Sequence, residues 1–125
     1  MTATSGVLQG RTILVAEDDP LIAPLLVDIL EAAGGTVMGP FPSLQLASDA
    51  LASQLPDAAL LDVNLVDGEV YPLASLLQES AVPYALFSAS NPEQVPGSLR
   101  PWTFLKKPAS MRDIVATVKG MLEKS

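Results

Sequence analysis

Strand-like and helix-like segments alternate along almost the whole chain, and this alternation limits the fold more than any other feature. Short runs of apolar and β-branched residues predict strands at residues 12–16, 36–39, 57–64, 83–90 and 102–106. Apolar residues at helical spacing predict helices at residues 20–35, 43–55, 68–80 and 110–124. Because the strands are apolar on both faces, they predict a parallel sheet with helices packed on each side.

Capping and helix-breaking residues mark the ends of these segments. Asp19, which precedes a proline, predicts the cap of the first helix, and Ser43 predicts the cap of the second. Residues 91–101 contain three prolines and one glycine, so we expect the fourth helix to be short or irregular. We expect residues 1–10 to be a flexible tail and residues 11–125 to form one domain.

The composition excludes several kinds of chemistry. The 125 residues include no cysteine and no histidine, which excludes disulfides, thiolate zinc sites, thiol catalysis and a Ser-His-Asp triad. No segment reads as a signal peptide, and no apolar run approaches the roughly 20 residues that a membrane helix needs. We therefore expect a cytoplasmic protein without a membrane partner.

The charges are divided unevenly along the chain. Residues 12–99 contain no lysine or arginine, although twelve of the fourteen acidic residues lie there. Binding to nucleic acid needs a basic face, which this stretch does not offer. A cation is the more natural partner for it.

Acidic residues follow two of the predicted strands. The first strand ends at Glu17, Asp18 and Asp19, and the third ends at Asp62. In a five-stranded sheet of order 2-1-3-4-5, ligands bind beyond the carboxyl ends of strands one and three, where the strand order reverses. Two remote segments would therefore place carboxylates in the same crevice.

The ends of strands four and five add a hydroxyl and two ammonium groups, from Ser88 and Lys106-Lys107. Carboxylates at such an edge suit Mg²⁺, and a carboxylate beside Mg²⁺ can accept a phosphoryl group. Each residue alone has a plainer explanation: Asp19 as a helix cap, Asp62 as a turn residue, the lysines as a solvated pair. Their coincidence at successive strand ends favours the phosphoryl chemistry.

At these residues the sequence resembles the receiver domains of bacterial response regulators, over residues 11–123. The acidic pair after the first strand matches Glu17 and Asp18, and the phosphoacceptor matches Asp62 in "LLDVN". The hydroxyl residue matches Ser88, and the lysine before proline matches Lys107 rather than its neighbour Lys106. The aromatic switch position matches Phe104.

The resemblance implies a flavodoxin-like, doubly wound fold and a Mg²⁺ ion held by Asp18, Asp62 and the backbone carbonyl of Asn64, with Glu17 acting through water. It also implies a cis peptide bond before Pro108. A sensor histidine kinase or a histidine phosphotransfer protein would donate the phosphoryl group. Ser88 and Phe104 would then switch a surface around residues 91–107, which a downstream protein target would bind.

A finer resemblance is to single-domain regulators with a Pro-Phe-x-Phe-Ala-Thr-Gly-Tyr motif on the fourth strand. Here that stretch is "PYALFSAS", in which Phe87 and Ser90 depart from the motif. We expect either a stand-alone receiver, which the short polar tail favours, or a receiver from a longer protein, and either a monomer or a weak homodimer. Two alternatives are a pseudo-receiver that binds partners without phosphorylation and an aspartate-nucleophile phosphohydrolase, although the latter's Asp-x-Asp motif and cap domain are missing.

Overall fold

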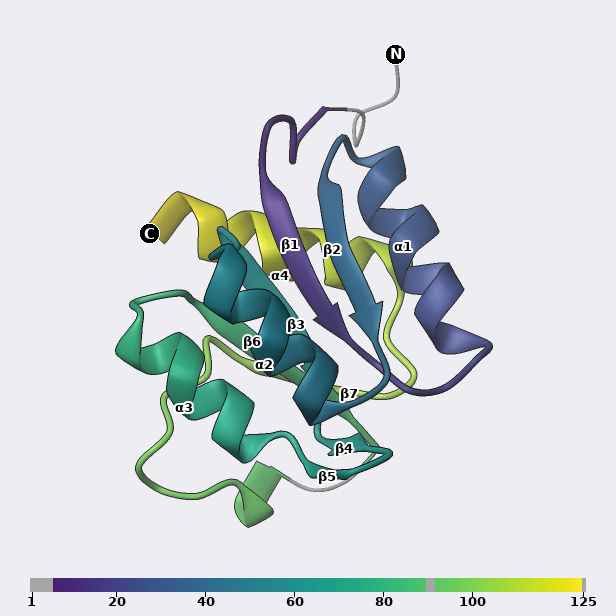
Figure 1. Ribbon diagram of the computed structural model, residues 1–125. Helices are drawn as coiled ribbons and strands as arrows, with labels where there is room; N and C mark the ends of the chain where they lie inside the picture. The colour runs from purple at the N-terminus through teal and green to yellow at the C-terminus, as the bar shows by residue number, and fades with distance from the viewer. Residues whose placement is uncertain (1–5, 90–91, 125) are drawn as a thin grey trace.

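A five-stranded parallel sheet forms the centre of the computed structural model, which describes residues 6–89 and 92–124 (Figure 1). Its strands are β1 (Thr12–Ala16), β2 (Thr36–Phe41), β3 (Ala58–Asp62), β6 (Tyr84–Ser88) and β7 (Phe104–Lys106). They lie in the order β2-β1-β3-β6-β7, all parallel, which confirms the predicted order 2-1-3-4-5. The last strand is shorter than predicted, and Trp102 precedes it.

Helices cover both faces of this sheet, as predicted (Figure 1). Helices α1 (Ile22–Ala32) and α4 (Met111–Lys124) share one apolar cluster with alternate residues of the strands. Helices α2 (Leu44–Ser53) and α3 (Tyr71–Glu79) share a second cluster with the intervening strand residues. We call these the α1/α4 face and the α2/α3 face. The fold is therefore the doubly wound, flavodoxin-like arrangement.

Helix α1 begins two residues later than predicted. The Asp19 carboxylate Oδ1 accepts hydrogen bonds from the backbone N–H groups of Leu21 at 2.8 Å and of Ile22 at 3.3 Å. These bonds hold Pro20 and Leu21 in a turn, and Leu21 is the residue that precedes the first helical position. The prediction that Asp19 is the cap residue is therefore wrong by two positions, although its carboxylate still satisfies free N–H groups at the start of the helix.

Helix α3 also begins later than predicted, because residues 64–69 form a small hairpin. Strand β4 (Asn64–Leu65) pairs antiparallel with β5 (Gly68–Glu69). Between them, Asp67 accepts hydrogen bonds from the backbone N–H groups of Leu44 at 2.7 Å and Gln45 at 3.1 Å. The hairpin is thus tied to the start of α2, where Ser43 accepts from Leu46 N as predicted.

The connection from β6 to β7 contains only one turn of 3₁₀ helix among its described residues, η1 (Pro92–Gln94), which confirms the expectation of a short or irregular helix. Residues 90 and 91 lie outside the described part of the chain. The peptide bond between Lys107 and Pro108 is cis, as the resemblance implies.

Residues 6–10 are not the flexible tail that we expected. The Leu8 side chain is fully buried in the cluster on the α1/α4 face, and Leu8 N donates to Ala33 O at 2.9 Å. An apolar side chain with a place in the core holds these residues against the sheet. Residues 1–5 of the expected tail lie outside the described residues. Within the described ranges, every helix is too short or too polar to span a bilayer.

Candidate functional site

The acidic residues predicted from the sequence meet at the carboxyl edge of β1 and β3. Ala16 pairs with Leu61 in these neighbouring strands, so Glu17 and Asp62 each lie one residue beyond a paired position. Side chains alternate between the faces of a strand, and Val15 and Leu60 both belong to the α1/α4 face. The side chains two residues further on therefore leave the sheet on that same face.

Glu17, Asp18 and Asp62 form a cluster that could hold a cation. Each contributes one carboxylate oxygen, and the three oxygens lie within 4.8 Å of one another. Glu17 is 2% exposed and Asp62 is 7% exposed, so two of the three carboxylates are almost withdrawn from water. A compact set of oxygen donors beside an open edge suits Mg²⁺, which takes one or two carboxylates and keeps several waters.

Lys107 supplies the positive charge of the cluster. Its Nζ lies 2.8 Å from Glu17 Oε1 and 3.2 Å from Asp62 Oδ2. The backbone N–H of Lys107 donates to Ser88 O at 2.9 Å, which ties the end of β7 to the end of β6. The neighbouring Lys106 is exposed and its side chain leaves on the other face, so only Lys107 reaches the carboxylates.

The close carboxylates change the proton affinity of Glu17. Burial, followed by a hydrogen bond shared with Asp62, raises the pKa of Glu17 to about 7, although Lys107 and the backbone N–H of Asp19 oppose the rise. Glu17 Oε1 is buried with the ammonium beside it but without a well-directed hydrogen bond. Burial alone would lower the pKa of Lys107, but Glu17 and Asp62 outweigh burial and raise it. An incompletely satisfied buried carboxylate fits a site built for a cation.

Two of the other predicted site residues, Ser88 and Asn64, lie close to this cluster in the fold. Ser88 is 2% exposed at the last position of β6, next to β3. Asn64 N lies 3.3 Å from Asp62 Oδ1, so the backbone after β3 folds back over the carboxylate. Phe104 is half-buried against the α2/α3 face, on the opposite side of the sheet from Glu17 and Asp62.

Two residues near the site were not predicted to contribute to it. The Phe87 ring centroid lies 5.1 Å from Lys107 Nζ, although the sequence marked Phe87 only as a departure from a motif. Asp67 holds the hairpin that carries Asn64, through its bonds to the start of α2. In the sequence, Asp67 directly precedes Gly68, which indicates a turn. This pattern does not indicate that Asp67 bonds to the start of α2.

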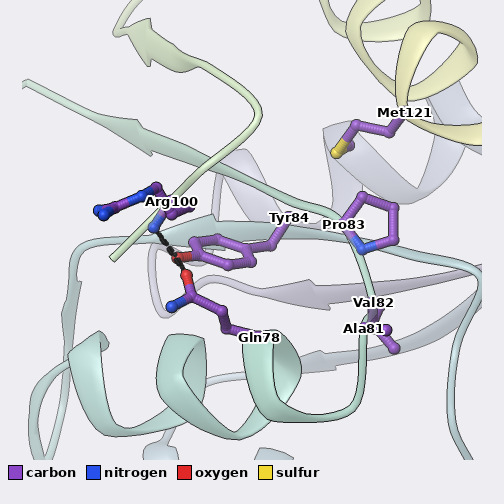
Figure 2. A pocket seen from close by; sticks show the side chains of 7 residues that line it. All are labelled: Gln78, Ala81, Val82, Pro83, Tyr84, Arg100 and Met121. Carbon is purple, nitrogen blue, oxygen red and sulfur yellow. Dashed lines mark hydrogen bonds between the residues drawn. The ribbon is translucent and has the colours of Figure 1, made fainter. Parts of the chain in front are cut away.

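A separate pocket lies at the opposite end of the sheet and does not belong to this site. It has a volume of about 270 Å³ and is lined by residues that include Tyr84, the first residue of β6, and Met121 of α4 (Figure 2). Beside it, the Gln78 side-chain oxygen accepts hydrogen bonds from the Tyr84 hydroxyl at 2.9 Å and from Arg100 N at 2.6 Å (Figure 2). This network attaches the segment before β7 to α3.

Comparisons with known proteins agree with the fold. No protein-family model matches the sequence. The receiver domain of a signal transduction histidine kinase from Syntrophus aciditrophicus is 27% identical, with a TM-score of 0.80 over 92% of each chain. The receiver domain of the PhyR response regulator from Erythrobacter litoralis is 25% identical, with a TM-score of 0.82 over 94% of each chain.

With this sheet order and this acidic cluster, the chain has the fold of the receiver domains of response regulators and is similar to them. Among curated proteins it is similar to the transcriptional regulatory protein GltR of Pseudomonas aeruginosa, with 31% identity over 93% of the chain. The chain spans about half the length of that relative, 50%.

Proposed function

We propose that the chain is a phosphoacceptor receiver in which Asp62 accepts a phosphoryl group from phosphohistidine. The observation that supports this most directly is the position of the Asp62 carboxylate. It lies beside Lys107 at 3.2 Å and within 4.8 Å of oxygens from Glu17 and Asp18, at the open edge of the sheet. In this arrangement the Asp62 carboxylate can act as a nucleophile, the Lys107 ammonium supplies positive charge beside it, and the neighbouring carboxylates offer oxygen ligands for a metal ion.

In the transfer, an Asp62 carboxylate oxygen attacks phosphorus, and the bond from phosphorus to the imidazole nitrogen breaks. The electron pair of that bond stays on the imidazole nitrogen of the donor, whose second ring nitrogen carries a proton, so the donor leaves as neutral imidazole and the charges and atoms balance. Mg²⁺, held by Asp18, Asp62 and the Asn64 carbonyl with Glu17 acting through water, would neutralise charge on the phosphoryl oxygens when bound. The Lys107 ammonium contacts another phosphoryl oxygen and moves from its present carboxylate partners by a short distance.

The signal then passes to a protein surface. The Ser88 hydroxyl donates to a phosphoryl oxygen, and Phe104 turns further into the α2/α3 face, which changes the surface around residues 91–107. The phosphoryl donor is a sensor histidine kinase or a histidine phosphotransfer protein, and the output is contact with a downstream protein. The segment of residues 92–101 has no regular helix beyond η1, which suits a surface that changes shape.

Intact mass measurement tests this proposal. The protein is incubated with acetyl phosphate and Mg²⁺, and we expect a gain of one phosphoryl group that is absent without Mg²⁺. Asp62→Asn removes the gain, whereas Asp28→Asn, which changes an exposed carboxylate on α1, leaves it intact. A wild-type protein that gains no phosphoryl group and binds no Mg²⁺ would instead be a pseudo-receiver. Rapid multiple turnover of phosphate esters would indicate a phosphohydrolase.

A further inference from the structure

The Phe87 side chain lies directly beside the ammonium group of Lys107. The nitrogen is 5.1 Å from the centre of the ring, within the range of a cation–π interaction. Phe87 is 4% exposed, so water does not compete for this side of the ring. The contact therefore joins a buried aromatic ring to the lysine ammonium that contacts Glu17 and Asp62.

The sheet register explains why the ring reaches this position. Phe87 pairs with Asp62 of β3 on one side and with Leu105 of β7 on the other. Phe87 belongs to the cluster on the α1/α4 face, as does Leu105, and Lys107 lies two residues beyond Leu105. The ring is therefore on the same face as the side chains of Glu17 and Asp62, between β3 and β7.

The ring completes the surroundings of the ammonium. A lysine ammonium has three N–H donors. Glu17 Oε1 lies 2.8 Å and Asp62 Oδ2 lies 3.2 Å from Lys107 Nζ, and the negative face of the ring adds a third attraction. A cation–π interaction is stronger where water is excluded, and here the ring is buried while 16% of the Lys107 side chain is exposed.

We propose that Phe87 is a positioning residue for Lys107. Its ring holds the ammonium beside Asp62, where the ammonium meets the incoming phosphoryl oxygens. This inference rests on the proposed function, because the position matters only if Asp62 is phosphorylated. Without the ring, only the two carboxylates hold the Lys107 ammonium, and its side chain turns toward solvent more often. Its charge is then less often in place when phosphorus is attacked.

A simpler explanation is that Phe87 only fills space, since it belongs to an apolar cluster. The two explanations differ in what they require of the side chain. Filling space requires volume, whereas attraction of a cation requires electron density on the ring face. Fluorine withdraws that density with little change of shape, so a series of mono-, di- and trifluorophenylalanine separates the two explanations.

The contact is tested first in the unphosphorylated protein, by NMR. Nuclei above a ring face are shifted upfield, so we expect the ε-methylene signals of Lys107 to lie upfield in the wild type and to move downfield in Phe87→Leu. The backbone amide spectrum checks that the variant remains folded. An unchanged Lys107 signal in a folded Phe87→Leu protein would overturn the proposal.

Phosphorylation kinetics test the consequence. We expect Phe87→Leu to slow the modification of Asp62 by acetyl phosphate about fivefold, which corresponds to about 1 kcal/mol at 1.36 kcal/mol per tenfold. Fluorination at position 87 should lower the rate in steps, whereas fluorination of Phe41, which packs on the α2/α3 face, should leave it unchanged. A slower Phe87→Leu protein with no response to fluorination would reduce Phe87 to a core residue and refute the positioning role. Absence of modification in the wild type would refute the proposed function, and the NMR comparison would still decide whether the ring holds the ammonium.

Discussion

The buried carboxyl group of Glu17 should make the protein less stable as the pH rises toward neutrality. Its pKa is about 7 in the folded protein, against an ordinary value of 4.5, because burial and Asp62 disfavour the charged form. The folded protein therefore holds a proton that the unfolded chain releases. The stability from this group is fully present below about pH 4.5 and is lost as the pH rises through about 7.

The size of the effect follows from the difference between the two pKa values. Between about pH 5 and pH 8, linkage gives a loss of about 2 to 3 kcal/mol, or about 10 °C in the midpoint of thermal unfolding. Because Glu17 is only 2% exposed, solvent screening lowers this loss of stability only slightly. Few other groups obscure it, because the chain has no histidine and no cysteine to titrate in this range.

Urea denaturation from pH 5 to pH 8, in EDTA so that no metal competes with the proton, measures this loss. Glu17→Gln should have a nearly flat stability profile over this range. Glu31→Gln, which changes an exposed carboxylate on α1, should keep the wild-type slope. The three proteins share one amino terminus, so the titration of its amino group cancels. An equally steep profile in Glu17→Gln, or a wild-type stability that increases with pH, would refute the reasoning.

Three further perturbations have definite outcomes. Gly39→Ala should lower the free energy of unfolding, measured by urea denaturation, by about 2–4 kcal/mol. The reason is that Gly39 has a φ of +115° and that an added Cβ would lie 2.7 Å from a backbone carbonyl oxygen of β1. Gln78→Leu should cost about 1–3 kcal/mol, because the Tyr84 hydroxyl loses its acceptor and Arg100 N keeps only the Tyr84 hydroxyl oxygen. Gln78→Glu, which keeps an acceptor, should cost less in the same assay. Mg²⁺ should raise the midpoint of thermal unfolding, and Asp18→Asn should remove most of that increase; an equal increase in the variant would argue against this ligand.

Most of the site could be predicted because of how a parallel sheet is built. The carboxyl ends of parallel strands meet at one edge, so residues that directly follow strands are brought together wherever the strands are correctly assigned. Glu17, Asp62 and Lys107 follow three different strands, and the structure brings their side chains within bonding distance. Ser88, at the end of a fourth strand, is buried beside them.

The starts of helices could not be predicted as well, because hydrogen bonds from residues outside the helix set them. Backbone N–H groups at the start of α2 donate to Asp67, which lies 23 residues beyond Leu44 in the sequence. Helix α3 begins after a hairpin whose strands have only two residues each, too few for an alternating pattern. Leu8 belongs to the core for a similar reason, since its partners come from α1 and β1 rather than from its own neighbours.

Local patterns in the sequence predict the alternating α/β architecture, the order along the chain of the residues that carry the chemistry, and the carboxylates that end the first and third strands. These follow from local patterns and from the geometry that all parallel sheets share. That Glu17 is buried with a raised pKa, and that the Phe87 ring lies beside Lys107, becomes clear only from the packed structure. Both depend on which side chains of separate strands share a face and exclude water, and this is settled only when the layers pack.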